Sequence, residues 1–244
     1  LRIGEGVLMN KEEACRYFKM AADKGQIDAM FNYGNMLRIG EGVLMNKEEA
    51  CRYFKMAAEK GEIDAMLNYG NMLYKGEGVS MNKETACRYY QIAANKGHIE
   101  AMFKYGLMLE HGEGVRMNKA EACRIYKMAA DKGEMNAMNN YGYMLETGEG
   151  IEMNKEKACQ YYKMAADKGH VKAMNNYGRM LSNGTGIIMN KEEASRYFKM
   201  AADKCHVIAM LNYAYMLYHG DGISMNKEEA NRYYKIAADK SHIE

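Results

Sequence analysis

Cysteine is the residue type here whose chemistry depends most on spacing. Five of the six cysteines recur at one interval of 36 residues, and Cys205 stands apart. Stacked helices lie about 8–10 Å apart, whereas a disulfide needs Cα atoms within about 7 Å and a metal site needs converging ligands. We therefore expect free thiols in a reducing compartment. We call the repeat position that these five cysteines share the cysteine slot. Serine and asparagine also occupy it, so it should require neither a sulfur atom nor burial. Its residues are Cys15, Cys51, Cys87, Cys123, Cys159, Ser195 and Asn231.

Histidine and glycine offer other possible chemistry. The Gly40-Glu41-Gly42 element could suggest a phosphate cradle, but no strand precedes it and no third glycine opens a helix. No nucleophile–base pair or carboxylate pair recurs. We therefore expect no enzyme activity, cofactor, metal or small-molecule substrate. The six histidines are scattered, and the four that share one position suggest a loop-packing role; these four are His98, His170, His206 and His242.

These residues sit in a sequence that repeats itself. A Met-Asn-Lys string begins at Met9, Met45 and Met81 and continues with the same period. A fixed period of this size indicates stacked helical or other supersecondary units. We predict one array over residues 1–244, which we expect to be a fragment of a longer array. Its parts are a half repeat (1–25), six full repeats (26–61, 62–97, 98–133, 134–169, 170–205 and 206–241) and a stub (242–244).

Each repeat is predicted to hold two helices. In the first full repeat, residues 26–61, helix A is predicted to span residues 27–39 and helix B residues 47–60. Gly40 and Gly61 are expected as left-handed helix stops, and Asn46 as an N-cap. At 100° per residue, one core stripe of helix A contains Ala29, Met30, Tyr33, Met36 and Leu37.

The recurring residues of one unit carry a family resemblance. They are Ala29, Tyr33, Gly34, Leu37, Gly40, Gly42, Val43, Asn46, Ala50, Tyr53, Phe54, Ala57, Ala58 and Gly61. This pattern resembles the Sel1-like repeat, a relative of the tetratricopeptide repeat (TPR), although tyrosine replaces the family's usual tryptophan at Tyr53. The resemblance implies an all-α fold, a right-handed α/α superhelical solenoid whose A helices line a concave groove. It also implies an adaptor or scaffold role in protein–protein interaction.

Five positions of helix A differ most between repeats and share one arc opposite the core stripe. Adaptation of this surface to a binding partner would produce this variation, and so would neutral sequence drift on a solvated face. Exposed aromatic residues and leucines among the variable residues favour partner binding. A row of side-chain amides flanks the arc. These amides either hydrogen-bond the backbone of a bound peptide, as in TPR proteins, or form local hydrogen bonds between helices. The candidate groove residues are Asp28, Phe31, Asn32, Asp64, Leu67, Asn68, Tyr74, Glu100, Phe103, Lys104, Tyr143, Glu146, Lys172, Arg179, Ile208, Leu211, Tyr215 and Tyr218, with Asn140, Asn176 and Asn212 completing the amide row.

We predict that the groove binds an extended peptide or a partner helix, with a partner carboxylate near Lys172 and Arg179. The apolar residues of the last repeat are either part of this site or an unmet repeat interface. An RNA-binding helical-repeat protein is the alternative. The net charge of +2 and the lack of a basic run argue against nucleic acid. No apolar stretch is long enough for a membrane span. The expected location is cytoplasmic; an ER-lumenal or secreted one stays open because the sequence begins in mid-pattern.

Overall fold

The structure is a computed structural model that describes residues 10–241. Residues 1–9 of the predicted half repeat and the predicted stub 242–244, with His242, lie outside the described residues. The described chain contains thirteen α-helices and no strand, which confirms the all-α fold. They are α1 (Lys11–Asp23), α2 (Ile27–Ile39), α3 (Lys47–Glu59), α4 (Ile63–Lys75), α5 (Lys83–Asn95), α6 (Ile99–His111), α7 (Lys119–Asp131), α8 (Met135–Thr147), α9 (Lys155–Asp167), α10 (Val171–Asn183), α11 (Lys191–Asp203), α12 (Val207–His219) and α13 (Lys227–Ser241).

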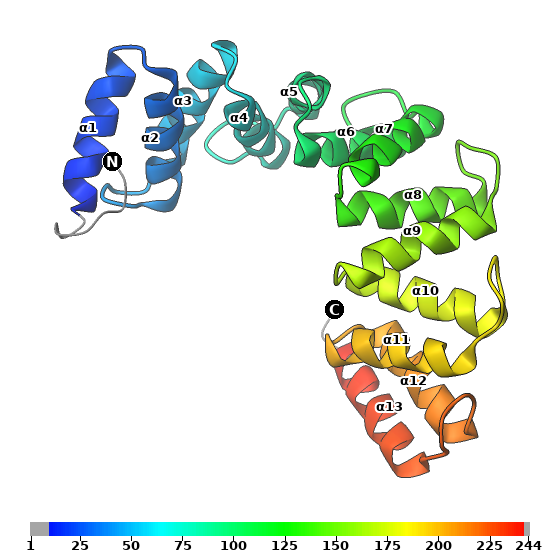
Figure 1. Cartoon of the computed structure of the whole chain (residues 1–244). Coiled ribbons are helices and arrows are strands. Elements are labelled where there is room, and N and C mark those ends of the chain that lie inside the picture. Colours follow the sequence, from blue (N-terminus) through cyan, green and yellow to red (C-terminus); the bar gives the residue numbers. More distant parts are fainter. Residues whose placement is uncertain (1–9, 242–244) are drawn as a thin grey trace. The chain divides into compact units, whose positions relative to one another are not determined.

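The helices fall into two compact units, residues 1–118 and 119–244. Within each unit, every helix packs against the next in the chain, so that A helices (even-numbered) alternate with B helices (odd-numbered) (Figure 1). This consecutive helix–turn–helix packing is the predicted solenoid arrangement. The prediction of one array over residues 1–244 stays a prediction.

The turn between helices A and B follows from a few residues. Gly40 ends α2 with φ 76°, and the Asn46 side chain accepts a hydrogen bond of 3.0 Å from the Glu49 N–H. The Asn46 N–H in turn donates to the Leu37 carbonyl at 2.9 Å. The expected helix stop and N-cap are therefore confirmed. Cys205 takes the place of the second helix stop and keeps its left-handed geometry, with φ 65°.

The core of each repeat is a sandwich of small, aromatic and methionine side chains. The predicted stripe of α2 is buried, and Tyr33 meets Tyr53 of α3 edge-to-face at 4.8 Å. A Cβ on Gly34 would lie 3.0 Å from the Phe54 ring, so glycine lets the aromatic ring approach helix A. Edge-to-face pairs contribute about 0.5–1.5 kcal/mol beyond area burial.

Gly42 has a role that the sequence did not indicate. A Cβ at this position would lie 2.2 Å from the carbonyl oxygen of Lys11, in the preceding helix B. Glu41 beside it forms an ion pair of 2.7 Å with the Lys11 amine. The glycine loop is therefore a packing surface between repeats as well as a turn.

The cysteine slot is buried, contrary to the expectation that it needs no burial. All five of its cysteines are buried free thiols, and Ser195 is buried with its hydroxyl donating to the Glu192 carbonyl at 2.8 Å. Only Asn231, in α13, is exposed. The slot therefore selects a small side chain because helix packing limits its volume.

Candidate functional site

The first turn of each A helix carries the most consistently exposed of the predicted groove positions. Its members differ in charge, from acidic residues in the first unit to lysine and isoleucine in the second. The exposed residues at this position are Asp28, Asp64, Glu100, Lys172 and Ile208. Lys172 makes no ion pair with the residues that the structure describes. This position therefore belongs to a surface that a partner can reach.

One turn further along helix A, the predicted groove residues lie mostly between repeats. Leu67 is buried, with 6% of its surface exposed, so its assignment to an exposed groove is wrong. Phe31 and Phe103 are half-buried. The following repeat covers this position, which burial of the equivalent Asn139 and Asn175 also indicates. Leu211 is the exposed exception.

The amide row forms local bonds between A helices in the second unit. The Asn176 amide donates to Asn139 Oδ1 at 3.1 Å, and the Asn212 amide donates to Asn175 Oδ1 at 2.9 Å. In the first unit the Asn32 amide donates to the Asp28 carbonyl at 2.7 Å. Of the two interpretations of the row, local bonding therefore accounts for these amides. Asn68 and Asn140 are half-buried, and Lys104 pairs with Glu100.

Arg179 and Glu146 form a charged cluster between two repeats of the second unit. The Arg179 guanidinium lies 2.7 Å from each carboxylate oxygen of Glu146, and the Tyr162 hydroxyl donates to the same carboxylate at 2.9 Å. Burial raises the pKa of Tyr162 far above its usual value, so its hydroxyl stays protonated and donates. Lys172 does not join this cluster. The predicted pair of free cations is therefore one free lysine and one arginine that already holds a carboxylate.

Tyr74 of the first unit also faces a neighbouring repeat. Its hydroxyl donates to Glu113 at 2.5 Å, and the Lys83 amine donates to the other oxygen of that carboxylate at 3.1 Å. These bonds lower the pKa of Glu113, with the tyrosine contributing most, so the carboxylate stays charged. Tyr74 is thus an inter-repeat contact rather than a free groove residue.

Three tyrosines remain exposed on the A helices of the second unit. Tyr143 of α8 is 44% exposed, and Tyr215 and Tyr218 of α12 are 55% and 38% exposed. Ile208 and Leu211 lie on the same α12 surface with similar exposure. Tyrosine and leucine at this exposure supply large contact areas to a binding partner.

The shared histidine position has a role that sequence reasoning missed. His98, His170 and His206 are N-caps, each accepting a hydrogen bond through Nδ1 from the backbone N–H three residues later at 3.1–3.2 Å. Burial, followed by the charge of Lys172, lowers the pKa of His170 and of His206. Their place directly before each helix was the available signal, but histidine is not among the usual N-cap residues.

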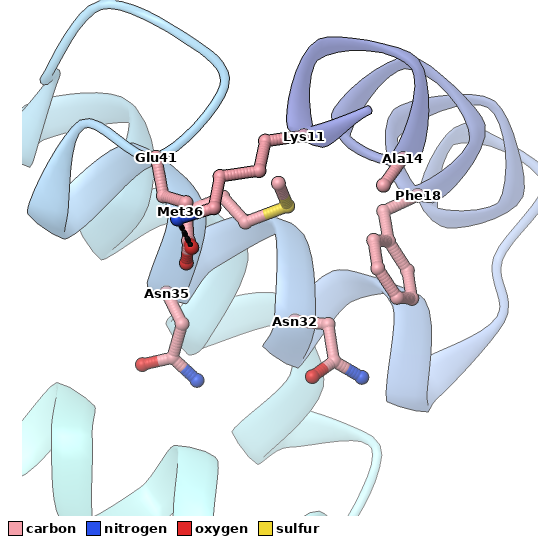
Figure 2. Close-up of a pocket in the computed structure, with 7 residues that line it drawn as sticks. All are labelled: Lys11, Ala14, Phe18, Asn32, Asn35, Met36 and Glu41. Carbon is pink, nitrogen blue, oxygen red and sulfur yellow. Dashed lines mark ion pairs between the residues drawn. The ribbon is translucent and has the colours of Figure 1, made fainter. Parts of the chain in front are cut away.

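A pocket of about 250 Å³ lies between α1 and α2 in the first unit (Figure 2). Phe18 and Met36 supply apolar lining, and the Lys11–Glu41 ion pair lies at one end. Its remaining lining residues are Ala14, Asn32 and Asn35.

Among residues 10–241, no His, Cys, Asp and Glu side chains gather as a metal site would require. No helix in that range combines the length and apolar character of a membrane span.

The solved structures that are similar to this chain include two with TM-scores above 0.8. A protective antigen of uropathogenic Escherichia coli, c5321, has an SLR fold, 26% sequence identity and a TM-score of 0.88; the match covers 93% of this chain and 48% of that one. This chain thus spans about half the length of that protein. A Sel1 repeat protein from Oxalobacter formigenes has 28% identity and a TM-score of 0.83, with 93% and 91% of the two chains covered. No curated protein matches the chain in sequence.

The family model for the Sel1 repeat matches the chain seven times, in the same 36-residue frame as the helix pairs. The matched residues are 2–26, 27–62, 63–98, 99–134, 136–170, 171–204 and 207–242. Proteins built from this repeat are generally non-catalytic scaffolds that bind other proteins. The chain belongs to the Sel1 repeat family.

Proposed function

We propose that this chain is a scaffold that binds a segment of another protein across the solvent-exposed faces of α8, α10 and α12, opposite the buried stripes of these helices. Three exposed side chains from this surface, one from each of three repeats, would contact the partner. Tyr143 lies on α8, Lys172 on α10, and Tyr215 on α12. The membership of the Sel1 repeat family supports a binding role in general, and these residues define the surface.

The observation that carries the proposal is the contrast between constant buried positions and variable exposed ones. Tyr141, Tyr177 and Tyr213 occupy the same buried position in three consecutive repeats. Two residues after the first of them, Tyr143 is exposed, and its equivalents in the next two repeats are Arg179 and Tyr215. Packing explains the constant tyrosines. It gives no reason for large aromatic side chains in water, whereas partner binding does, since tyrosine and arginine are enriched among residues that dominate binding energy.

The charges favour a protein partner with an acidic residue near Lys172. This lysine is exposed, and a partner carboxylate would meet no competing acid in an ion pair with it. Arg179 would contribute only by sharing its contact with Glu146, which is 14% exposed. The first unit places Asp28, Asp64 and Glu100 at the equivalent position, which would repel the phosphates of RNA.

The spacing between adjacent A helices suits a partner segment in an extended conformation. Adjacent A helices lie about 10 Å apart, which corresponds to about three residues of extended chain at 3.3 Å per residue. A partner segment of about seven residues would therefore reach from Tyr143 to Tyr215. An acidic residue near its middle would lie beside Lys172.

A peptide-display selection against the whole chain tests the proposal. Selected peptides should carry an acidic residue between apolar ones, and Lys172→Glu should weaken binding at least tenfold. The charge-reversal control is Lys199→Glu on helix α11, where Lys199 pairs with Asp203 and binding should stay unchanged. Binding in 50 mM and 200 mM salt separates the peptides from RNA, since RNA affinity falls steeply with salt. Equal loss in both variants, or a preference for RNA, would overturn the proposal.

A further inference from the structure

Each histidine cap of an A helix uses its two ring nitrogens for different contacts. In His98, His170 and His206, Nδ1 accepts a hydrogen bond from the backbone N–H three residues later. A neutral imidazole has one donor and one acceptor, so Nε2 carries the proton in all three rings. Each cap therefore presents an Nε2–H group that can donate to a residue outside its own helix.

Two of these donors meet an acceptor in the preceding repeat. His98 Nε2 lies 3.1 Å from Asp64 Oδ1, and His170 Nε2 lies 3.2 Å from Asn136 Oδ1. Both acceptors stand 34 residues before their histidine, at the second residue of the preceding A helix. The contact between Asp64 and His98 shows that this position accommodates a carboxylate beside the ring.

The third donor, on His206, has a lysine at the position of these acceptors. This lysine is Lys172, the second residue of α10. An ammonium group donates hydrogen bonds and cannot accept one. Among residues 10–241, no group accepts a hydrogen bond from His206 Nε2, and Lys172 makes no ion pair. Two donors, one of them charged, are therefore left without an acceptor at a position where the other repeats supply one.

The two donors belong to helices that are in contact. The Asn212 amide of α12 donates to Asn175 Oδ1 of α10 at 2.9 Å, near the helix ends that carry His206 and Lys172. Burial, followed by the charge of Lys172, lowers the pKa of His206 below the usual value of about 6.5, so the ring is neutral at pH 7 and Nε2 stays a donor. Lys172 is exposed and His206 is half-buried, so a partner side chain can reach both.

We propose that Lys172 and His206 form a binding site for the carboxylate of an aspartate or glutamate side chain in the partner segment. One carboxylate oxygen accepts from the Lys172 ammonium and the other from His206 Nε2–H, so the partner supplies the acceptor that Asp64 supplies beside His98. Hydrogen bonds to an ionised carboxylate are stronger than neutral ones. A side chain fits better than a C-terminus, because the proposed segment continues in both directions past Lys172. This inference rests on the proposed function and assigns His206 to the selection of an acidic residue.

The first test needs no partner. Lys172→Asp places a carboxylate where Asp64 stands beside His98, so the Nε2–H proton of His206 should gain an acceptor. Proton NMR of the whole chain labelled with ¹⁵N-histidine should then show this proton protected from exchange with water. In the unchanged chain the same proton should exchange fast. Equal exchange in the two chains would mean that His206 Nε2 does not face this position and would overturn the inference.

The second test compares two peptides, one selected on the whole chain with a single acidic residue and the same peptide with that residue as its amide. His206→Asn keeps the helix cap but removes the Nε2–H group. It should weaken binding of the acidic peptide about tenfold, as expected for one lost hydrogen bond to a charged group, and hardly change binding of the amide peptide. The matched control is His98→Asn, because His98 already contacts Asp64. This variant should bind both peptides like the unchanged chain.

The outcomes separate this inference from the proposed function. If the acidic peptide needs Lys172 but binds His206→Asn as tightly as the unchanged chain, the inference is wrong and the proposed function stands. If no selected peptide needs Lys172, both are wrong. Amidation of the C-terminus of the acidic peptide should leave its affinity unchanged. A loss of affinity would assign the carboxylate to the terminus and overturn the choice of an acidic side chain.

Discussion

The guanidinium of Arg179 lies 2.7 Å from both carboxylate oxygens of Glu146, in the preceding repeat. We predict that Arg179→Ala lowers the free energy of unfolding by about 1.5–3 kcal/mol, as expected for a lost hydrogen bond to a charged group. Most of this cost would come from leaving the poorly exposed Glu146 carboxylate with only the Tyr162 hydroxyl. Urea unfolding measures the change. The double variant Arg179→Ala with Glu146→Gln should regain part of the loss, and a purely additive result would contradict the coupling.

Two glycines that both have positive φ should differ sharply in their tolerance of alanine. A Cβ on Gly78 would lie 2.3 Å from the Lys47 carbonyl carbon, whereas a Cβ on Gly61 would meet nothing within 4 Å. Both have positive φ, which alone costs about 1–2 kcal/mol for alanine. Gly78→Ala should cost at least ~2 kcal/mol more than Gly61→Ala in thermal or urea unfolding, since the repeats must move apart. Equal costs would mean that the glycine loop does not contact the preceding repeat.

The histidine caps predict a pH-dependent stability. Burial lowers the pKa of His170 and His206 in the folded chain, below the unfolded value of about 6.5. Their contribution is therefore complete above pH 6.5 and is lost as the pH falls through the folded pKa. The unfolding free energy should drop between pH 7 and pH 5. The double variant His170→Asn with His206→Asn should show a smaller drop, because asparagine caps a helix at both pH values. An unchanged drop would assign the effect to other groups.

Thiol reactivity should divide the cysteines into two classes. Burial raises the pKa of Cys51, Cys87, Cys123 and Cys159 to about 11, which leaves almost no reactive thiolate at pH 8. Cys205 is exposed. Alkylation of the native chain at pH 8 should therefore modify Cys205 first, and denaturation without reductant should release six thiols. A count of four or fewer after denaturation would demonstrate disulfides and contradict the reducing-compartment prediction.

The helices themselves were predictable because their determinants are local. Asn46, Gly40 and the stripe around Tyr33 act within a few residues of one another, so the predicted bounds of α2 match and those of α3 differ by one residue. The burial of Leu67 was not predictable in this way. Its cover comes from the following repeat, and a helical wheel places it on the outer arc without any information about that neighbour.

The position of the candidate site on the A helices was predictable, but the ion pairs between its charged side chains were not. The sequence placed Glu146 and Arg179 in different repeats and gave no sign that they meet. Residues 33 apart came together because the helix spacing brings one turn of α8 beside one turn of α10. The ion pair between Lys11 and Glu41 was likewise hidden, since such pairs become visible only when the glycine loops are seen against the preceding B helices.

Photo-crosslinking tests most directly whether partners bind the solvent-exposed face of the A helices. A benzophenone amino acid at Tyr143 or Tyr215 should crosslink to a peptide selected on the whole chain, because both side chains lie on that face. The same group at Met164 or Met200, which are each 45% exposed on B helices, should give little product. Crosslinking confined to Tyr143 and Tyr215 is the predicted result. Equal or stronger crosslinking from Met164 and Met200 would place the binding surface on the B helices and contradict the account.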